Sequence, residues 1–485
     1  MIPLLFFGNI HVSALEKEDR LWQDETVYYI MIDRFLNGDS DNDYDVNPQD
    51  LNAYNGGDFQ GIIEKLDYIK DMGFTTIALS PIFENEENSY QGDLVTNFYK
   101  TEEHFGSLQE FKTLVKEAHE KDLKVMIEFV ADEVAPSHEW TKDSSKEAYF
   151  ILGSTRLNLE NNEVKNDLVD VGKWWIEETD IDGYYLSDVN KLPTTFWSDF
   201  SQAMKDVKKD FFLFGTMAEG DMTPFLSAGF DGIMSREQIE SLSMAFEQVD
   251  SKISGNILEV AEQGMQFLEE GKHLGMALDD KQSARFTEGI VNLKQNPATR
   301  WKLALAYTYT TPSIPVVFYG SEIAIAGSKT PENHRLMGFR AEEELINHIT
   351  TLGRLRQELP ALTRGNFDLL HEEDGLVVYK RSYKDEVIVV AINNSAKTQQ
   401  VTLTNDSLGK EKELRGLFAG DLSREDDNGE YQIIIDREEV EIYALVDKTT
   451  IKISYIAAIA MVWVLFALFI YLVMKRSKRN ASSKN

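Results

Sequence analysis

The stretch that decides the fold is residues 56–85, which read GGDFQGIIEKLDYIKDMGFTTIALSPIFEN. Apolar residues recur at helical spacing from Phe59 to Asp71, and the apolar run Thr75–Ser80 follows a turn that contains Gly73. An apolar period near 3.6 residues predicts an amphipathic helix, and a short apolar run after a turn predicts a buried strand. This stretch is therefore one helix–strand unit of an α/β fold.

The same alternation extends in both directions along the chain. Helical spacing recurs over 105–121 and 162–178, and short apolar runs predict further strands at 28–32, 124–130, 183–186, 211–214, 229–233, 276–278 and 313–319. Strands that alternate with helices imply parallel β/α units, and about eight such units imply a closed barrel. We therefore predict a (β/α)8 TIM barrel over residues 21–362.

The pattern changes after Arg364-Gly365. Apolar runs rich in β-branched residues follow one another without helical stretches between them, at 376–382, 386–393, 399–403, 431–435 and 439–446. Such a series predicts an antiparallel β domain, here over residues 365–447.

Two terminal segments suggest a membrane protein. Residues 456–474, IAAIAMVWVLFALFIYLVM, contain no charge and are long enough to span a bilayer as a helix. The basic residues that follow predict a cytoplasmic tail over 475–485, with the domains before the helix outside the cell membrane. Residues 1–14 resemble a cleaved signal peptide, whose start we expect to be incomplete because no Lys or Arg precedes its apolar run. The alternative for residues 456–474 is a buried core helix.

Charge and cysteine content exclude several classes of function. The formal net charge is -33 and cysteine is absent. An acidic chain lacks the basic face that nucleic acids require, so we expect no nucleic-acid partner. Without cysteine, neither disulfides nor thiol chemistry is available.

Several segments resemble the α-amylase family, glycoside hydrolase family 13, most of all its neopullulanases and cyclodextrin glucanotransferases. The resemblance covers about residues 21–447, and motifs that carry it include VYYIMIDRFLNGDSDND at 27–43, HFGSLQEFKTLVKEAHEKDLKVMIEFV at 104–130, PSIPVVFYGSEIAIAG at 312–327 and GLVVYKRSYKDEVIVVAINNS at 375–395. It implies the barrel, a short domain B at about 131–160 and a C-terminal β-sandwich.

The resemblance also shows where catalytic groups are expected. Ser187 stands at the family's nucleophile, Thr216 at its acid/base and Gln282 at its third acid, while Tyr185 and Lys281 replace an arginine and a histidine. Retaining glycosidases need two carboxyl groups, and neither serine nor threonine ionises near neutral pH. We therefore expect no catalytic residue at these positions and a catalytically inactive pseudoenzyme rather than an enzyme.

Displaced carboxylates are the alternative, and they would make the chain an active α-glucan hydrolase. Asp188, Glu219, Asp279 and Asp280 lie close in sequence to the family positions. A shift of one residue on a strand turns a side chain to the opposite face. Asp188 should therefore point away from the barrel mouth unless a bulge intervenes.

A calcium site is implied by the resemblance. In the relatives, a loop after the first strand and a Gly-Gly-Asp turn hold the ion, and the matching positions here are Asn37, Asp39, Asn42, Asp43, the backbone of Gly56, and Asp58. Oxygen donors at short spacing suit calcium, which takes about 6–8 such ligands. The alternative is a solvated acidic loop.

Three residues are candidates for sugar contact. Tyr90 matches a tyrosine that stacks on sugar in relatives, Trp140 matches an aromatic residue of domain B, and Arg285 follows the altered seventh-strand motif. The alternative for the two aromatic residues is ordinary packing in the core or at the surface.

These observations lead to one expectation and two rivals. We expect a membrane-anchored, extracytoplasmic pseudoenzyme that binds α-glucan or another carbohydrate, or that scaffolds a membrane-protein partner. The first rival is the active α-glucan hydrolase. The second is a cell-surface structural protein that does not bind sugar.

Overall fold

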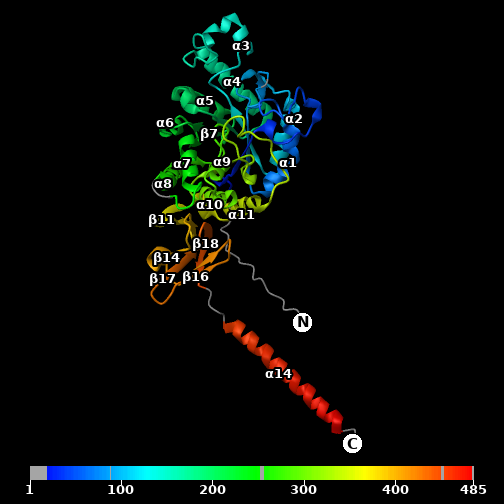
Figure 1. Ribbon diagram of the computed structural model, residues 1–485, viewed down its shortest axis with the longest axis vertical. Coiled ribbons are helices and arrows are strands. Elements are labelled where there is room, and N and C mark those ends of the chain that lie inside the picture. The colour runs from blue at the N-terminus through cyan, green and yellow to red at the C-terminus, as the bar shows by residue number, and fades with distance from the viewer. Residues whose placement is uncertain (1–18, 88, 252–255, 449–452, 483–485) are drawn as a thin grey trace.

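The computed structural model describes residues 19–87, 89–251, 256–448 and 453–482, without the side chains of 256–257, 453–459 and 476–482. Figure 1 shows a large α/β domain followed by a smaller β domain and a C-terminal helix. The signal peptide predicted over 1–14 lies outside the described residues.

Eight parallel strands close into a barrel within the described residues, in the order β1-β10-β9-β8-β7-β6-β5-β2. This arrangement confirms the predicted (β/α)8 barrel. The strands are short and almost fully buried, as expected where helices cover the outside and side chains fill the inside. Their bounds are β1 Val27–Ile30, β2 Thr76–Leu79, β5 Lys124–Phe129, β6 Gly183–Leu186, β7 Phe212–Met217, β8 Gly232–Ser235, β9 His273–Met276 and β10 Ile314–Phe318.

The helices around the barrel begin where capping side chains satisfy their first backbone N–H groups. Asp58 accepts from Gly61 at the start of α1, and Ser107 and Glu110 form a capping box at the start of α2. The larger helices are α1 Phe59–Asp71, α2 Leu108–Glu120, α4 Asn162–Thr179, α5 Thr194–Val207, α7 Arg236–Phe246, α8 Asn256–Glu269, α10 Pro297–Thr310 and α11 Glu344–Glu358; shorter ones are α6 Thr223–Ser227, α9 Phe286–Asn292 and α12 Pro360–Arg364.

Two strands lie a few residues from their predicted positions. Gly229 has a positive φ of 105° and belongs to a turn, so β8 begins only at Gly232. Strand β9 ends at Met276, where its pairing with β10 also ends, although the next two residues are apolar and buried. Those residues carry the chain out of the barrel toward Asp279.

Two excursions rise above the carboxyl ends of the strands. The hairpin β3 (Phe83–Asn85) and β4 (Val95–Thr101) follows β2. The segment after β5 contains α3 (Glu139–Lys142) and a 3-10 helix over Ser144–Tyr149, and α3 lies at the top of Figure 1.

The C-terminal domain is a β-sandwich, as predicted. A six-stranded sheet, ordered β11-β12-β13-β18-β15-β16, faces the two-stranded sheet β14-β17, and every pairing in them is antiparallel. Buried residues of both sheets, such as Val389 and Ile433, form one apolar core. The bounds are β11 Asn366–Glu373, β12 Leu376–Tyr383, β13 Glu386–Asn393, β14 Gln399–Thr404, β15 Lys412–Gly416, β16 Leu422–Arg424, β17 Glu430–Ile435 and β18 Glu439–Asp447, with α13 at Asn405–Leu408.

The last helix, α14 (Ile453–Ser482), contains the predicted membrane span, of which residues 456–459 lie outside the described side chains. No helix in the described part of the chain is both long and apolar enough to cross a bilayer. This finding contradicts the transmembrane helix predicted over 456–474, and with it the single-pass membrane location and the cytoplasmic tail over 475–485.

Candidate active site

A narrow pocket opens at the carboxyl ends of the barrel strands. It is lined by side chains that stand at or just beyond those ends, namely Tyr29, Tyr185, Ser187, Thr216, Arg236, Asp279, Asp280, Lys281, Gln282, Val316 and Phe318. Its cavity volume is about 30 Å³. Active sites of TIM barrels lie at this face, so the pocket is the candidate active site.

Ser187, Thr216 and Gln282 line this pocket together, although they come from three separate parts of the barrel. The Ser187 hydroxyl donates to Glu128 Oε1 at 2.5 Å. The Thr216 hydroxyl accepts from the Asp188 backbone N–H at 3.4 Å, and the Gln282 amide donates to Asp188 Oδ2 at 3.4 Å. All three side chains thus form hydrogen bonds with neighbouring acidic residues.

Glu128, on strand β5, is fully buried on the floor of the pocket. Its carboxylate accepts hydrogen bonds from the Tyr29 hydroxyl, the Ser187 hydroxyl and the Lys281 ammonium, the last at 2.6 Å. A buried carboxylate with three donors, one of them a cation, is satisfied.

Lys281 provides the cation for two carboxylates. Its Nζ lies 2.6 Å from Glu128 and 2.7 Å from Asp93, a half-exposed residue in the loop before β4. Burial opposes the charged form, but the attraction of Asp93 and Glu128 outweighs it and raises the pKa of Lys281. Lys281 is therefore a permanent cation and cannot act as a base at neutral pH.

Asp188 does not itself line the pocket, but its carboxylate contacts Arg236 and Gln282, which do. Strand β6 ends at Leu186, and Asp188 adopts a left-handed conformation with φ 50°, so the alternation of faces along the strand no longer applies. Its carboxylate contacts Arg236 Nη2 at 2.5 Å and Lys191 Nζ at 3.1 Å. Burial favours the neutral acid, but the hydrogen bond from Lys191 and the charge of Arg236 outweigh it and lower the pKa of Asp188.

Asp280 stands on the other side of Arg236. Its Oδ2 lies 3.5 Å from Arg236 Nε, and its Oδ1 accepts from the backbone N–H groups of Gln282 and Ser283. Asp188 and Asp280 therefore share one guanidinium at the pocket.

Asp279 lies deeper in the fold and plays a structural role. It is paired with Arg285 at 3.4 Å and accepts from Ser321 Oγ and from the Phe286 backbone N–H. Burial raises its pKa. Glu219, the remaining displaced carboxylate considered from the sequence, is exposed in the turn after β7 and does not line the pocket.

The predicted sugar-contact residues lie in packed surroundings. Tyr90 is buried, with the Arg34 guanidinium 3.7 Å from the centre of its ring and His334 on its hydroxyl. Trp140 packs among aromatic side chains of the excursion after β5, and Arg285 lies over the ring of Phe318. Their contact with sugar stays a prediction.

Two features of the site were not predicted from the sequence. The role of Arg236 was missed because it follows β8, where no family motif drew attention. The pairing of Glu128 with Lys281 could have been inferred from the sequence. Because Tyr185 replaces the family's arginine, Glu128 on the neighbouring strand needs another cation, and the altered seventh-strand motif supplies Lys281.

Part of the predicted calcium site comes together. A methyl group on Gly56 would lie 2.7 Å from Asn37 Nδ2 and 3.0 Å from Asp43 Oδ1, so this turn touches the loop after β1. Asn42 Oδ1 is buried and has no hydrogen-bond partner among the described residues. Asp43 Oδ1 accepts from the Asn37 amide at 2.7 Å, so the unpartnered Asn42 oxygen is the atom that best suits calcium, and Asn37, Asp43 and the backbone of Gly56 lie close enough to add oxygen ligands.

Two predicted ligands of that site are otherwise engaged. The Asp58 carboxylate accepts from backbone N–H groups at the start of α1 and in the loop, and Asp39 caps the short turn that follows it. Among the described residues, no group of three or more His, Cys, Asp or Glu side chains is arranged to hold a metal. Amide and backbone oxygens would therefore have to supply most of the ligands.

A (β/α)8 barrel with paired carboxylates at its carboxyl face fits the glycoside hydrolases. Residues 29–150 and 147–354 match the family described as Alpha amylase, catalytic domain, and residues 365–443 match the Alpha-amylase C-terminal domain. The chain therefore belongs to the α-amylase family.

Solved structures agree with this assignment. The chain is 46% identical to an alpha-amylase from Anoxybacillus, with a TM-score of 0.86 over 89% of this chain and 100% of that chain. It is 43% identical to an alpha-amylase from Geobacillus thermoleovorans complexed with acarbose, with a TM-score of 0.84 and the same coverage.

Curated relatives are more distant in sequence. The cyclomaltodextrinase of Thermoanaerobacter pseudethanolicus is 29% identical over 84% of this chain and 78% of its own length. The Beta/alpha-amylase of Paenibacillus polymyxa is also 29% identical, and the match spans 90% of this chain but only 39% of that longer protein.

These relatives carry the names of enzymes. This finding contradicts the expectation of a catalytically inactive protein that only binds glucan or scaffolds a membrane partner.

Proposed function

We propose that this protein hydrolyses α-glucans at the pocket lined by Ser187, Thr216 and Gln282. The observation that carries the proposal is the position of Asp188, which is paired with Lys191 and with Arg236, a residue that lines the pocket. A glycosidase needs one ionised carboxylate to stabilise or attack the sugar cation. The lowered pKa of Asp188 suits that role.

Asp280 is the second carboxyl group in this proposal. Glycosidases place their two carboxyl groups about 5–9.5 Å apart, the shorter spacing for retention and the longer for inversion. Asp188 and Asp280 contact different nitrogens of the Arg236 guanidinium, which holds their carboxylates close enough to meet this requirement.

The substrate class follows from the relatives. Alpha-amylases and a cyclomaltodextrinase are among the proteins similar to this chain, and one of those alpha-amylases was solved with acarbose. Maltooligosaccharides are therefore the first substrates to test. Acidic side chains at the opening match the hydroxyl groups that such sugars present.

The test is cleavage of maltoheptaose by the full chain with calcium present, followed by mass spectrometry over several days. Asp188→Asn and Asp280→Asn should each lower the rate by at least about a thousandfold, because each removes a carboxylate that acts at the reacting bond. Glu219→Gln is the matched control and should retain the activity, since Glu219 is exposed outside the pocket. No cleavage by a folded sample, or equal cleavage by all three variants, would overturn the proposal.

We also propose that calcium stabilises the loop after β1. Asn37, Asn42, Asp43 and the backbone of Gly56 supply the oxygen atoms, and the unpartnered Asn42 Oδ1 is the observation that supports the site. Such an ion would hold the loop against the Gly-Gly-Asp turn and so brace the start of α1.

A further inference from the structure

A second cavity lies at the opposite, amino-terminal end of the barrel. It has a volume of about 90 Å³ and is lined by residues of the segment before β1, the ends of α1 and α2, and the helices α11 and α12. Four of its side chains are cationic and two are carboxylates, a local excess of positive charge in a chain with a net charge of -33. The cationic side chains are Arg20, Lys70, Arg356 and Arg364.

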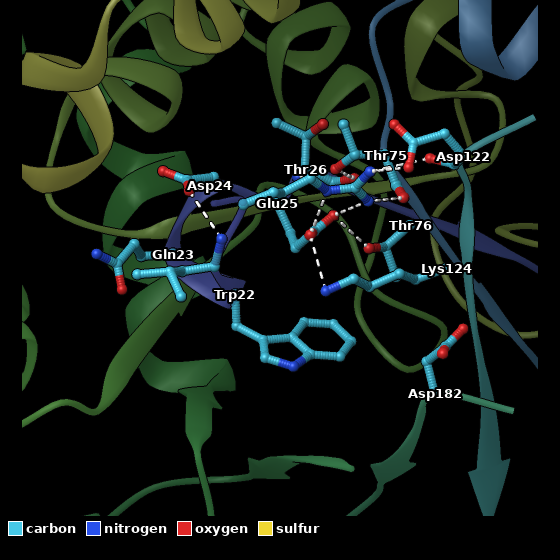
Figure 2. Close-up of polar contacts among 12 residues, drawn as sticks. Trp22, Gln23, Asp24, Glu25, Thr26, Thr75, Thr76, Asp122, Lys124 and Asp182 are labelled. Carbon is cyan, nitrogen blue, oxygen red and sulfur yellow. Dashed lines mark hydrogen bonds and ion pairs between the residues drawn. The ribbon is translucent and has the colours of Figure 1, made fainter. Parts of the chain in front are cut away.

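The carboxylates around this cavity are already engaged by other side chains. Glu25 is fully buried and is held by Arg20 at 2.7 Å, Lys124 at 3.2 Å and the Thr76 hydroxyl at 2.9 Å, as Figure 2 shows for Lys124 and Thr76. Asp24 accepts from Thr363 and Arg364. No carboxylate oxygen within salt-bridge distance remains for Arg356 among the described residues.

Arg356 is therefore a buried cation without an anionic partner. It is 2% exposed, and its hydrogen bonds go to the backbone carbonyls of Tyr309, Gln23 and Ser313. Its Nε has no hydrogen-bond partner among the described residues. An unpaired charge and an unused donor are both costly inside a protein. Burial lowers the pKa of Arg356 to about 10.

Lys70 completes the charge at the rim of the cavity. Its side chain is 33% exposed, and its nearest carboxylate oxygen, on Asp122, is 3.7 Å away. The same Asp122 is held more closely by Arg20, at 2.9 Å. Lys70 can therefore turn toward a ligand without leaving Asp122 unpaired.

We propose that this cavity binds an oxyanion of the phosphate class, with Arg356 at its base and Lys70 at its rim. Guanidinium groups bind phosphate oxygens well because their donors are planar and permanently charged. The volume corresponds to about three water molecules, which is larger than a single halide ion requires. The site lies at the barrel end opposite the candidate active site and does not depend on the proposed hydrolase function.

The experiment measures the melting temperature of the full chain against inorganic phosphate at constant ionic strength, with sodium chloride as the balancing salt. A ligand that binds only the folded state raises the melting temperature with saturation. Lys70→Gln should weaken the apparent affinity for phosphate about tenfold, the effect of losing one charge-assisted hydrogen bond. Lys116→Gln, a charge change on exposed α2 far from the cavity, should leave the affinity unchanged.

Lys70 is used as the first variant because removal of the buried Arg356 can prevent folding. A parallel titration with glucose 6-phosphate separates the two sources of the anion. A response to both ligands supports a phosphoryl group on a larger molecule, and a response to inorganic phosphate alone supports the free ion. An unsaturable rise, an equal rise with chloride, or identical curves for Lys70→Gln and Lys116→Gln would overturn the proposal.

Discussion

Lys281 and Glu128 form a buried ion pair on the floor of the pocket, with Nζ 2.6 Å from Oε1. Glu128 belongs to strand β5, whereas Lys281 follows β9 on another side of the barrel. The pair therefore ties two parts of the barrel mouth together. Ser187 donates to the same carboxylate oxygen, so the position aligned with the family nucleophile depends on this pair for its orientation.

We predict that Lys281→Met destabilises the protein by about 3–5 kcal/mol, because it leaves Glu128 as a buried carboxylate without a cation. Urea unfolding at pH 7 measures the change. Adding Glu128→Gln to the same chain should restore most of the loss, since the neutral amide no longer needs a counter-ion.

The control for this prediction is an exposed ion pair. Lys100→Gln removes the contact with Glu84, in which the two side chains are 62% and 36% exposed. Exposed pairs contribute at most about 1 kcal/mol. Equal losses in Lys281→Met and Lys100→Gln would show that the buried pair does not hold the pocket.

A second prediction concerns pH and His104. Burial favours the neutral imidazole, but Glu102, 2.5 Å from Nδ1, outweighs this effect and raises the pKa of His104. Because the pKa of His104 is higher in the folded than in the unfolded protein, its protonation stabilises the fold. This stabilisation is complete below the unfolded-state pKa of about 6.5 and is lost as the pH rises through the folded-state pKa. The melting temperature of His104→Gln should therefore fall furthest below that of the parent near pH 6 and approach it at pH 9.

His348 provides the opposite case. Burial lowers its pKa to about 4, so this side chain is neutral in the fold at pH 6. The folded state then loses stability as pH falls from about 6.5 toward 4. The difference in melting temperature between the parent and His348→Gln should become smaller on acidification, whereas the difference for His104→Gln should become larger. Parallel pH curves for the two variants would contradict the electrostatic interpretation.

Periodicity in the sequence was sufficient to predict the barrel and an antiparallel β domain, and the resemblance to the α-amylase family implied that this domain is a β-sandwich. Each helix buries one apolar stripe and each strand one short apolar run, so the local pattern and the global fold agree. Strand ends were predicted less well, because the apolar residues Ala277 and Leu278 are buried in a loop and not in β9. A short apolar run indicates burial but does not show whether the buried residues pair as a strand or form a loop.

The site was harder to predict than the fold. The rule of alternating faces predicts that Asp188 points away from the barrel mouth, but it does not apply there, because the strand ends two residues earlier and the backbone turns left-handed. The ion pairs of Arg236 and Lys281 join residues that are 48 and 153 positions apart from their partners. Only the closed barrel brings such residues together.

The third prediction concerns Gly61, on helix α1. Replacing a helical glycine by alanine usually stabilises a helix by about 1 kcal/mol. At Gly61, however, a methyl group would lie 1.9 Å from the Leu36 carbonyl oxygen, which is backbone and cannot easily move. Gly61→Ala should therefore destabilise the protein by about 1–3 kcal/mol or more, measured by urea unfolding.

Gly289, on helix α9, is the matched control. A methyl group there would also be too close to its neighbour, at 2.2 Å, but that neighbour is the flexible carboxylate of Glu247. Because Glu247 can move aside, Gly289→Ala should cost much less than Gly61→Ala. A neutral or stabilising Gly61→Ala would show that the approach of α1 to the loop after β1 is looser than the structure has it.

The same loop is the subject of the last prediction. If Asn42, Asp43 and the turn at Gly56 hold calcium, the ion binds the folded state and raises its free energy of unfolding by about 2.7 kcal/mol at a hundred times its dissociation constant. The melting temperature should rise with calcium, fall with a chelator, and rise less in Asp43→Asn, which removes a charged oxygen ligand. Asp45→Asn is a suitable control, since Asp45 is exposed two residues away and its positive φ of 51° suits asparagine. If calcium raised the melting temperature of both variants equally, the ion would bind elsewhere. The unpartnered Asn42 Oδ1 would then not be explained by a calcium ion.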